Sequence, residues 1–346
     1  MKKFILLGLL YTSIPILGGI LNSVFLQVDQ GDLVRLGKLY RNDLPREKLD
    51  LQRNRKYKTL NELNLNQEND FDILTIGDSF SEFGNGYQNG LIERGYKVVN
   101  FEHKLTSNPI QELIDIVNSD LLDRINIDFI VLESIQRDFN ERCSQLEFNR
   151  SVNIDSLYKT NWTQRKTKKV SYANEFFSIG TITAPFVNLA YLFLSKPPMF
   201  SDTYKLDLTS SNLFSSKVSD LLVYKDDILK MKSKNSVIET KRSVESLNLI
   251  SRLLTQKGIK LVVMIAPDKY DLFYNKIAKK HQIVEPQFFT EYKNLSKNYF
   301  DVSLYSEFVL AMNNNVQDIY FYDDSHWSPI GQEIAADLIV KCINSH

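Results

Sequence analysis

The feature that most constrains the fold is a series of short apolar segments with amphipathic stretches between them. A continuously apolar run, in place of strict alternation, is typical of a strand that is covered on both faces. The intervening stretches repeat apolar residues at helical spacing, so the sequence predicts an α/β fold with a mostly parallel sheet and helices on both sides. The expected strands are residues 72–77, 97–101, 128–134, 260–267 and 317–322, with a weaker candidate at 300–305.

The chain of 346 residues is long enough for one large domain or two small ones. We expect an N-terminal apolar segment over residues 1–27 and a polar stem with a lead-in strand or two over 28–70. A main domain over 71–346 follows. Residues 141–240 break its strand–helix rhythm and are rich in Ser and Lys, which indicates an insertion.

The N-terminus predicts a membrane location. Lys2 and Lys3 precede an uncharged stretch from Phe4 to Leu26 that is long enough to cross a bilayer as a helix. Because no A-x-A site follows, an uncleaved signal anchor is favoured over a cleaved signal peptide. The charge pattern places the body outside the cytoplasm, in the periplasm or at the cell surface. A second apolar run at 176–195 contains Pro185 and polar residues, so packing on the domain or the bilayer surface is favoured over a second span.

Composition excludes several classes of protein. The 42 basic and 42 acidic residues balance, so no global field would attract nucleic acid. The two cysteines, Cys143 and Cys342, lack metal-ligand spacing, and a single disulfide between them is left open. No phosphate-binding glycine loop or flavin fingerprint occurs, so the sequence predicts no cofactor and no metal.

A serine follows the first strong strand. In open α/β sheets, ligands bind beyond the carboxyl ends of the strands, and "LTIGDSF" places Ser79 at such an end. Gly77 permits a tight turn there. A serine hydroxyl needs an adjacent base to act as a nucleophile. Taken alone, the turn could equally well cap a helix through Asp78 or Ser79.

One histidine is suited to be that base. His326 lies between an expected strand and an amphipathic C-terminal helix, at the same edge as Ser79. Asp323 and Asp324 precede it, and either could fix the imidazole tautomer, as the acid of a catalytic triad does. His103 follows a strand and is a reserve candidate. The remaining histidines are His281, in a Lys-rich helical segment, and His346, the last residue.

These motifs resemble a known family. "GDSFS" and "DDSHW" are similar to the first and last sequence blocks of the SGNH (GDSL-like) hydrolase superfamily, in the usual order. Trp327 after the histidine resembles the D-x-H-W signature of the extracytoplasmic polysaccharide O-acetyltransferases, which include the alginate O-acetylation and DHHW-type proteins. Residues 129–137 and 262–274 resemble further segments of that group. The glycine block and the G-x-N-D block of the superfamily are not recognisable.

The resemblance implies a flavodoxin-like three-layer sandwich in which Ser79 is the nucleophile and His326 the general base. Superfamily spacing makes Asp323 the preferred acid, whereas the D-x-H-W spacing makes Asp324 the alternative. The Ser79 backbone N–H is the expected oxyanion donor.

Other residues are assigned more loosely. Asn108, Ser134 or Ser107 could supply further oxyanion donors. Trp327 and Arg137 are expected at the substrate pocket, with Arg137 forming a buried ion pair with Glu133.

The function that follows is a membrane-anchored O-acyltransferase, expected to be an O-acetyltransferase, that modifies hydroxyls of a cell-surface polysaccharide or glycan. A membrane-bound acyltransferase is the expected source of the acyl group. Two alternatives stay open at this point: a carbohydrate esterase with the same triad, and a non-catalytic envelope scaffold. The sequence does not define the acceptor glycan, the acyl donor or the oligomeric state.

Overall fold

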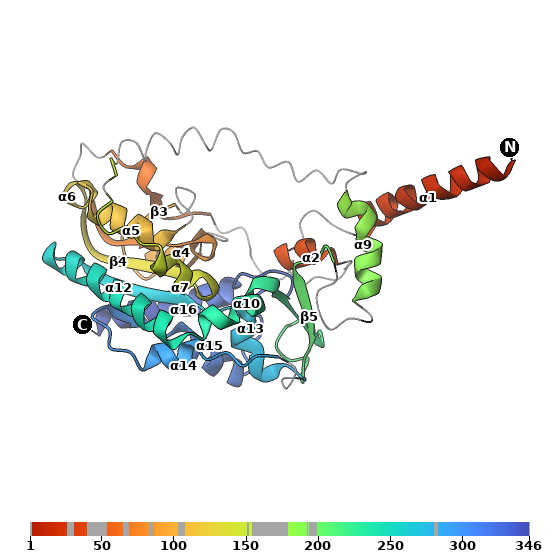
Figure 1. Cartoon of the computed structure of the whole chain (residues 1–346). Helices are drawn as coiled ribbons and strands as arrows, with labels where there is room; N and C mark the ends of the chain where they lie inside the picture. Colours follow the sequence, from red (N-terminus) through yellow and green to blue (C-terminus); the bar gives the residue numbers. More distant parts are fainter. Residues whose placement is uncertain are drawn as a thin grey trace.

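The structure is a computed structural model of the whole chain (Figure 1). Its described residues are 2–25, 31–39, 54–64, 69–82, 86–102, 108–150, 152–153, 179–191, 193, 199–279 and 283–345.

A parallel six-stranded sheet forms the centre, with strand order β1-β3-β2-β4-β7-β8. Without the short edge strand β1, the remaining strands have the doubly wound 2-1-3-4-5 order of flavodoxin-like sheets. The expected mostly parallel α/β architecture is therefore confirmed. The strands are β1 (Lys58–Thr59), β2 (Asp70–Ile76), β3 (Val98–Phe101), β4 (Asn126–Ile135), β7 (Lys260–Ala266) and β8 (Phe300–Val302).

One expected strand was wrong. Residues 317–322 form no ladder with the sheet, and only an isolated bridge joins Tyr320 to Trp327. The segment is apolar because its tyrosines are buried beside loops: the Tyr320 hydroxyl donates to the carbonyl of Pro267. Burial without strand pairing produces the same sequence pattern as a covered strand.

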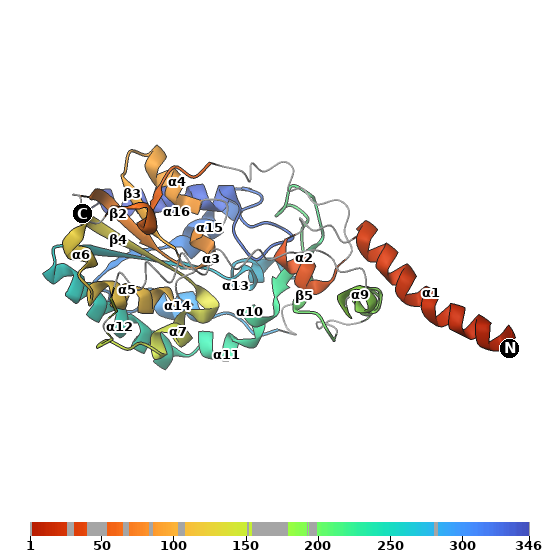
Figure 2. The same ribbon diagram turned by 90° about the horizontal axis from the view of Figure 1, so that it is seen from above.

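Helices cover both faces of the sheet, which gives three layers (Figure 2). Ile73 of β2 points into one core and its neighbour Leu74 into the other, as the alternation of side chains along a strand requires. The first core is covered by α4 (Gly86–Glu93), α15 (Leu304–Asn313) and α16 (Pro329–Asn344). The second is covered by α5 (Pro109–Val117), α6 (Leu121–Arg124), α7 (Gln136–Ser144), α12 (Val237–Gln256) and α14 (Phe288–Lys293).

The two cysteines lie on opposite sides of the sheet. Cys143 is buried in the second core, and Cys342 packs against the first. Both are free thiols, so the disulfide left open by the sequence is not formed. Burial raises the pKa of the Cys143 thiol to about 12, which keeps it protonated and unreactive.

The N-terminal helix α1 (Lys2–Phe25) extends away from the body (Figures 1 and 2). Helix α9 (Ile179–Ala190), from the second apolar run, contacts α1. Many apolar side chains of α1 are exposed, including Phe4 and Leu6. Within the described ranges, no helix combines the length and apolar character needed to cross a bilayer. The signal anchor stays a prediction.

In the described part of the expected insertion, two strands and two short helices lie between α9 and α12. The strands pair with each other in antiparallel fashion. The elements are β5 (Thr203–Asp207), β6 (Asp220–Tyr224), α10 (Lys225–Leu229) and α11 (Met231–Lys234).

A close helix contact in the first layer gives a test of this packing. A Cβ at Gly90 of α4 would lie 2.8 Å from the Cβ of Ala336 of α16. We expect Gly90→Ala to lower the free energy of unfolding by about 1–3 kcal/mol, because overpacking forces the helices apart. Chemical denaturation measures this, and the cost should shrink in an Ala336→Gly background. An equal cost in both backgrounds would contradict the contact.

Candidate active site

Ser79 lies where the strand order of the sheet reverses. Strands β3 and β4 flank β2 on either side, and ligands of doubly wound sheets bind at this switch point. Strand β2 ends at Ile76, and Ser79 opens the short helix α3 (Ser79–Glu82). Only glycine fits at position 77, because a Cβ there would lie 1.9 Å from Ser81 Oγ and 2.6 Å from Glu133 Oε2.

Asp78 ties this turn to β4 and α7. Its Oδ2 accepts hydrogen bonds from the Ile135 N–H at 2.9 Å and from Arg142 Nη1 at 2.6 Å. Its Oδ1 accepts from the Phe80 N–H at 3.1 Å. Burial would raise the pKa of Asp78, but the Arg142 charge and these hydrogen bonds outweigh it and lower the pKa. The turn that carries Ser79 is thus held by an ionised carboxylate.

Glu133 is a fully buried carboxyl directly beneath the turn. Its Oε2 accepts from the Asp78 N–H at 3.0 Å and from Ser81 Oγ at 2.9 Å. Burial, followed by the nearby Asp78 charge, raises its pKa well above the ordinary value of 4.5. Burial therefore favours the protonated form of Glu133, which supports the turn through these two hydrogen bonds.

His326 contacts both Ser79 and an acid. Its Nε2 lies 2.8 Å from Ser79 Oγ, and its Nδ1 lies 2.6 Å from Asp324 Oδ1. An ionised carboxylate can only accept, so Nδ1 carries the proton and Nε2 is left to accept from the serine hydroxyl. This is the tautomer that a serine nucleophile requires.

The choice between the two aspartates is corrected by this geometry. Asp323 was preferred from its spacing, but Asp324 is the residue whose carboxylate contacts the imidazole. The reason is local: Asp324 Oδ1 also accepts from the His326 N–H at 3.0 Å, which forms an Asx turn and brings the carboxylate beside its own i+2 residue. The Asp323 carboxylate accepts from the Gly31 N–H at 2.6 Å.

Lys269 lies beneath the histidine loop. This first residue of α13 (Lys269–Phe273) is buried. Its Nζ donates to the backbone carbonyls of Phe321, Tyr322 and Asp324 at 2.8 to 3.0 Å. Burial lowers its pKa to about 8, against the attraction of nearby aspartates. One ammonium group thereby fixes the backbone path into His326.

Trp327 does not line an open pocket, contrary to expectation. It is fully buried, and its Nε1 donates to the Phe80 carbonyl at 3.0 Å. Its ring meets Phe80 and Tyr87 edge-on, with centroids 5.4 and 6.2 Å apart. Because Phe80 follows Ser79, Trp327 joins the serine turn to the histidine loop.

Arg137 pairs with residues other than the expected Glu133. Its Nη1 lies 2.9 Å from Asp268 Oδ1 and 3.1 Å from Asp227 Oδ1, which are both buried. Arg142 is the arginine connected to Glu133: it donates to the Asp78 carboxylate, and the Asp78 N–H donates to Glu133. Arg137 is therefore a part of a buried charge cluster beside the site.

Two of the three proposed oxyanion side chains, Asn108 and Ser134, are engaged elsewhere. Asn108 caps α5 by accepting from the Ile110 N–H, and its Nδ2 donates to the Arg142 carbonyl at 3.0 Å. Ser134 Oγ accepts from Arg142 Nη1 at 2.7 Å. The Ser79 N–H begins a helix, where backbone donors have no partner within the helix. The other candidates, Ser107, His103, His281 and His346, lie outside the described residues.

Asp32 was missed by sequence reasoning, because it lies in a polar stem without a recognisable motif. Its Oδ2 lies 3.9 Å from His326 Nδ1. Burial and the Asp324 charge raise the pKa of Asp32. Asp32, Asp324 and His326 offer atoms within 4.8 Å of one another, a set that could hold a cation. In this structure His326 Nδ1 is hydrogen-bonded to Asp324, so the two aspartates orient the imidazole ring of His326.

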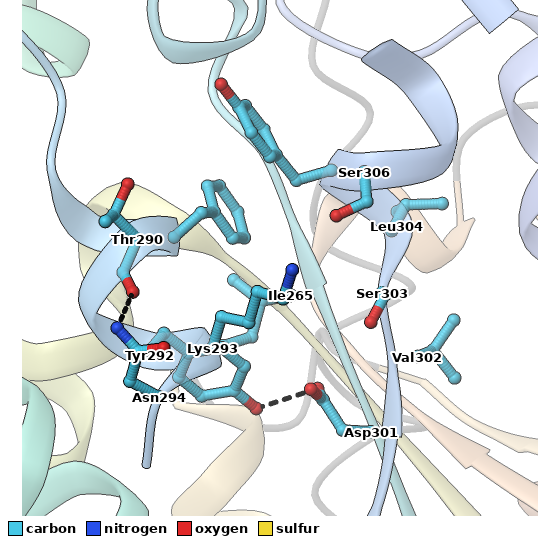
Figure 3. Close-up of a pocket in the computed structure, with 12 residues that line it drawn as sticks. Ile265, Thr290, Tyr292, Lys293, Asn294, Asp301, Val302, Ser303, Leu304 and Ser306 are labelled. Carbon is cyan, nitrogen blue, oxygen red and sulfur yellow. Dashed lines mark hydrogen bonds between the residues drawn. The ribbon is translucent and has the colours of Figure 1, made fainter. Parts of the chain in front are cut away.

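A separate cavity of about 390 Å³ opens at the carboxyl ends of β7 and β8 (Figure 3). The helix α14 forms one wall and the start of α15 the other, with Ile265 from β7 between them. Tyr292 donates to Asp301 Oδ1 at 3.0 Å across this cavity. Its lining includes neither Ser79 nor His326.

Comparison with protein families gives one match. Residues 222–346 match the family described as SGNH hydrolase-like domain, acetyltransferase AlgX. The resemblance to this family is confirmed over that range. The matched part contains Lys269, Asp324 and His326, whereas Ser79 lies before it. No curated protein and no solved structure matches the chain.

The raised pKa of Glu133 can be tested through the pH dependence of protein stability. An acid whose pKa is raised on folding stabilises less as pH rises above its unfolded value, here 4.5, towards its folded value. We expect Glu133→Gln, which keeps the shape without the titration, to gain about 1.4 kcal/mol per pH unit over the wild type in that window. Urea denaturation at several pH values measures the difference. Parallel stability curves for the two proteins would show that Glu133 is not neutral in the fold.

Proposed function

We propose that this protein is an O-acyltransferase that transfers an acetyl group through Ser79 onto a hydroxyl of a cell-surface glycan. One observation carries the proposal: His326 contacts Ser79 Oγ through one ring nitrogen and Asp324 through the other. The match of residues 222–346 to an SGNH hydrolase-like acetyltransferase domain supports the choice of acyl transfer.

The first half-reaction forms an acyl-enzyme. Ser79 Oγ attacks the carbonyl carbon of an acyl ester while His326 Nε2 takes the hydroxyl proton. Asp324 stabilises the imidazolium that results. The Ser79 N–H is the proposed donor to the oxyanion. When the tetrahedral intermediate collapses, the bond to the leaving alcohol breaks and His326 returns the proton to that alcohol.

The second half-reaction uses the same groups in reverse. His326 takes the proton from an acceptor hydroxyl, whose oxygen attacks the acyl carbon on Ser79. The Ser79 ester bond breaks, and the proton returns to Ser79 Oγ. A water molecule in place of the acceptor would complete an esterase reaction, so exclusion of water separates the two activities.

We propose further that the body works outside the cytoplasm, with residues 1–27 as its anchor and a membrane-bound acyltransferase as acyl donor. The support is the sequence: Lys2 and Lys3 precede a long uncharged stretch, and the resemblance is to extracytoplasmic acetyltransferases. Chemical labelling of introduced surface cysteines in intact cells, with and without permeabilisation, tests the orientation.

The acyl-enzyme is directly testable. Incubation of the full chain with an activated acetyl ester should acetylate Ser79, and peptide mass spectrometry locates the group. Ser79→Ala should abolish labelling, whereas Ser144→Ala, which removes an exposed hydroxyl from α7, should not. Labelled enzyme that releases acetate equally fast with and without oligosaccharide would be an esterase. Absence of label from Ser79 would favour a non-catalytic scaffold.

The two aspartates should differ sharply in activity. Asp324→Asn should lower kcat by about 10³- to 10⁴-fold, because an amide no longer enforces the required tautomer of His326. Asp323→Asn should lower kcat by no more than about tenfold, since Asn can still accept from the Gly31 N–H and loses only about 1 kcal/mol. Steady-state hydrolysis of an activated ester measures both variants. A larger loss from Asp323→Asn would reverse the assignment.

A further inference from the structure

A short N-terminal segment packs directly on the histidine loop. Residues 31–34, here named the strap, contain Gly31 and the first turn of α2 (Asp32–Gly37). The Leu33 and Val34 N–H groups donate to the Asp323 carbonyl at 3.1 and 3.3 Å. The strap is thereby joined to a loop almost three hundred residues away.

Further bonds involve the side chains of both segments. The Asp32 N–H donates to Asp324 Oδ2 at 3.2 Å, so both oxygens of Asp324 are engaged, one by His326 and one by the strap. In return, Asp32 Oδ1 accepts from the Ser325 N–H at 2.7 Å, and Asp32 Oδ2 accepts from Ser325 Oγ. The strap therefore contacts Asp323, Asp324 and Ser325, the three residues directly before His326.

The strap is itself fixed by the insertion. Thr203 Oγ1 donates to the Leu33 carbonyl at 2.7 Å, and the Asp202 N–H donates to the Leu36 carbonyl at 3.2 Å. Beyond the helix, Lys38 Nζ donates to Thr183 Oγ1 at 2.9 Å. A segment held on both sides can hold a catalytic carboxylate in one orientation, because its own position is determined.

We propose that the strap is a component of the active site and that Asp32 is a positioning residue for Asp324 and His326. Asp32 acts by holding the Ser325 backbone and by placing a second carboxylate 3.9 Å from His326 Nδ1. The acid of this site is thus oriented by a residue from the N-terminal stem, outside the expected main domain. This inference rests on the proposed nucleophilic role of Ser79.

The test uses a fluorophosphonate probe on the full chain. Ser79 Oγ forms a bond to phosphorus, fluoride leaves, and His326 takes the hydroxyl proton, so labelling reports activation of the serine without an acceptor. Asp32→Asn should lower kinact by about ten- to a hundredfold with KI nearly unchanged, because misorientation affects the chemical step. Arg35→Ala, at an exposed position of α2, is the matched control and should keep the wild-type kinact.

A second variant disrupts the packing of the strap on the histidine loop by a steric clash. A Cβ at Gly31 would lie 2.2 Å from the Asp323 carbonyl oxygen, and the backbone φ of −56° at Gly31 is open to alanine. Gly31→Ala should therefore displace the strap and also lower kinact. Thermal unfolding of each variant separates this effect from loss of the fold.

The outcomes distinguish the two proposals. If the wild type is labelled at Ser79 and Asp32→Asn reacts equally fast, the strap inference is wrong while the nucleophile stands. If Asp32→Asn raises KI with unchanged kinact, Asp32 contacts the ligand and is not a positioning residue. A loss of kinact shared by Arg35→Ala would assign the effect to α2 as a whole and overturn the role of Asp32. If the wild type is not labelled at Ser79, both proposals are wrong.

Discussion

The hydrogen bond between Ser79 Oγ and His326 Nε2 is the interaction on which the site depends. It joins residues 247 positions apart, and the parallel sheet is what allows this. Strand β2 ends just before Ser79, at the switch point of the sheet. Helix α16 packs on the first core and fixes the preceding loop, which contains His326. Because β2 ends at this edge and α16 packs on the first core, the loop before α16 reaches Ser79, although no strand of the sheet leads into that loop.

Buried ionisable groups hold the two loops in place. Glu133 and the Asp78–Arg142 pair hold the serine turn, and Lys269 holds the histidine loop through backbone carbonyls. Glu133, Asp78 and Lys269 bond to the backbone, and Arg142 donates to Asp78. Hydrogen bonds are stronger in a buried, low-dielectric setting, so these groups restrict the loops more strongly than apolar packing would.

Several sequence-based assignments failed for the same reason. Asn108 was offered as an oxyanion donor, Trp327 as a pocket residue from the D-x-H-W resemblance, and Arg137 as a partner of Glu133, yet each makes structural contacts that sequence spacing does not specify. The strand expected at 317–322 was a buried loop, since tyrosines covered by neighbouring segments resemble a covered strand. The preference for Asp323 over Asp324 was wrong, because a single Asx turn decides which carboxylate faces the ring.

The sequence by itself determined the layered α/β architecture and the two motifs that contain Ser79 and His326. Apolar periodicity and turn residues are local properties, so they can be recognised without knowing which segments meet. Only the tertiary structure decided that Asp324 faces the imidazole, that Glu133 and Lys269 are buried supports, and that Asp32 from the stem reaches the loop. These are contacts between distant segments, and their geometry depends on packing that no local pattern records.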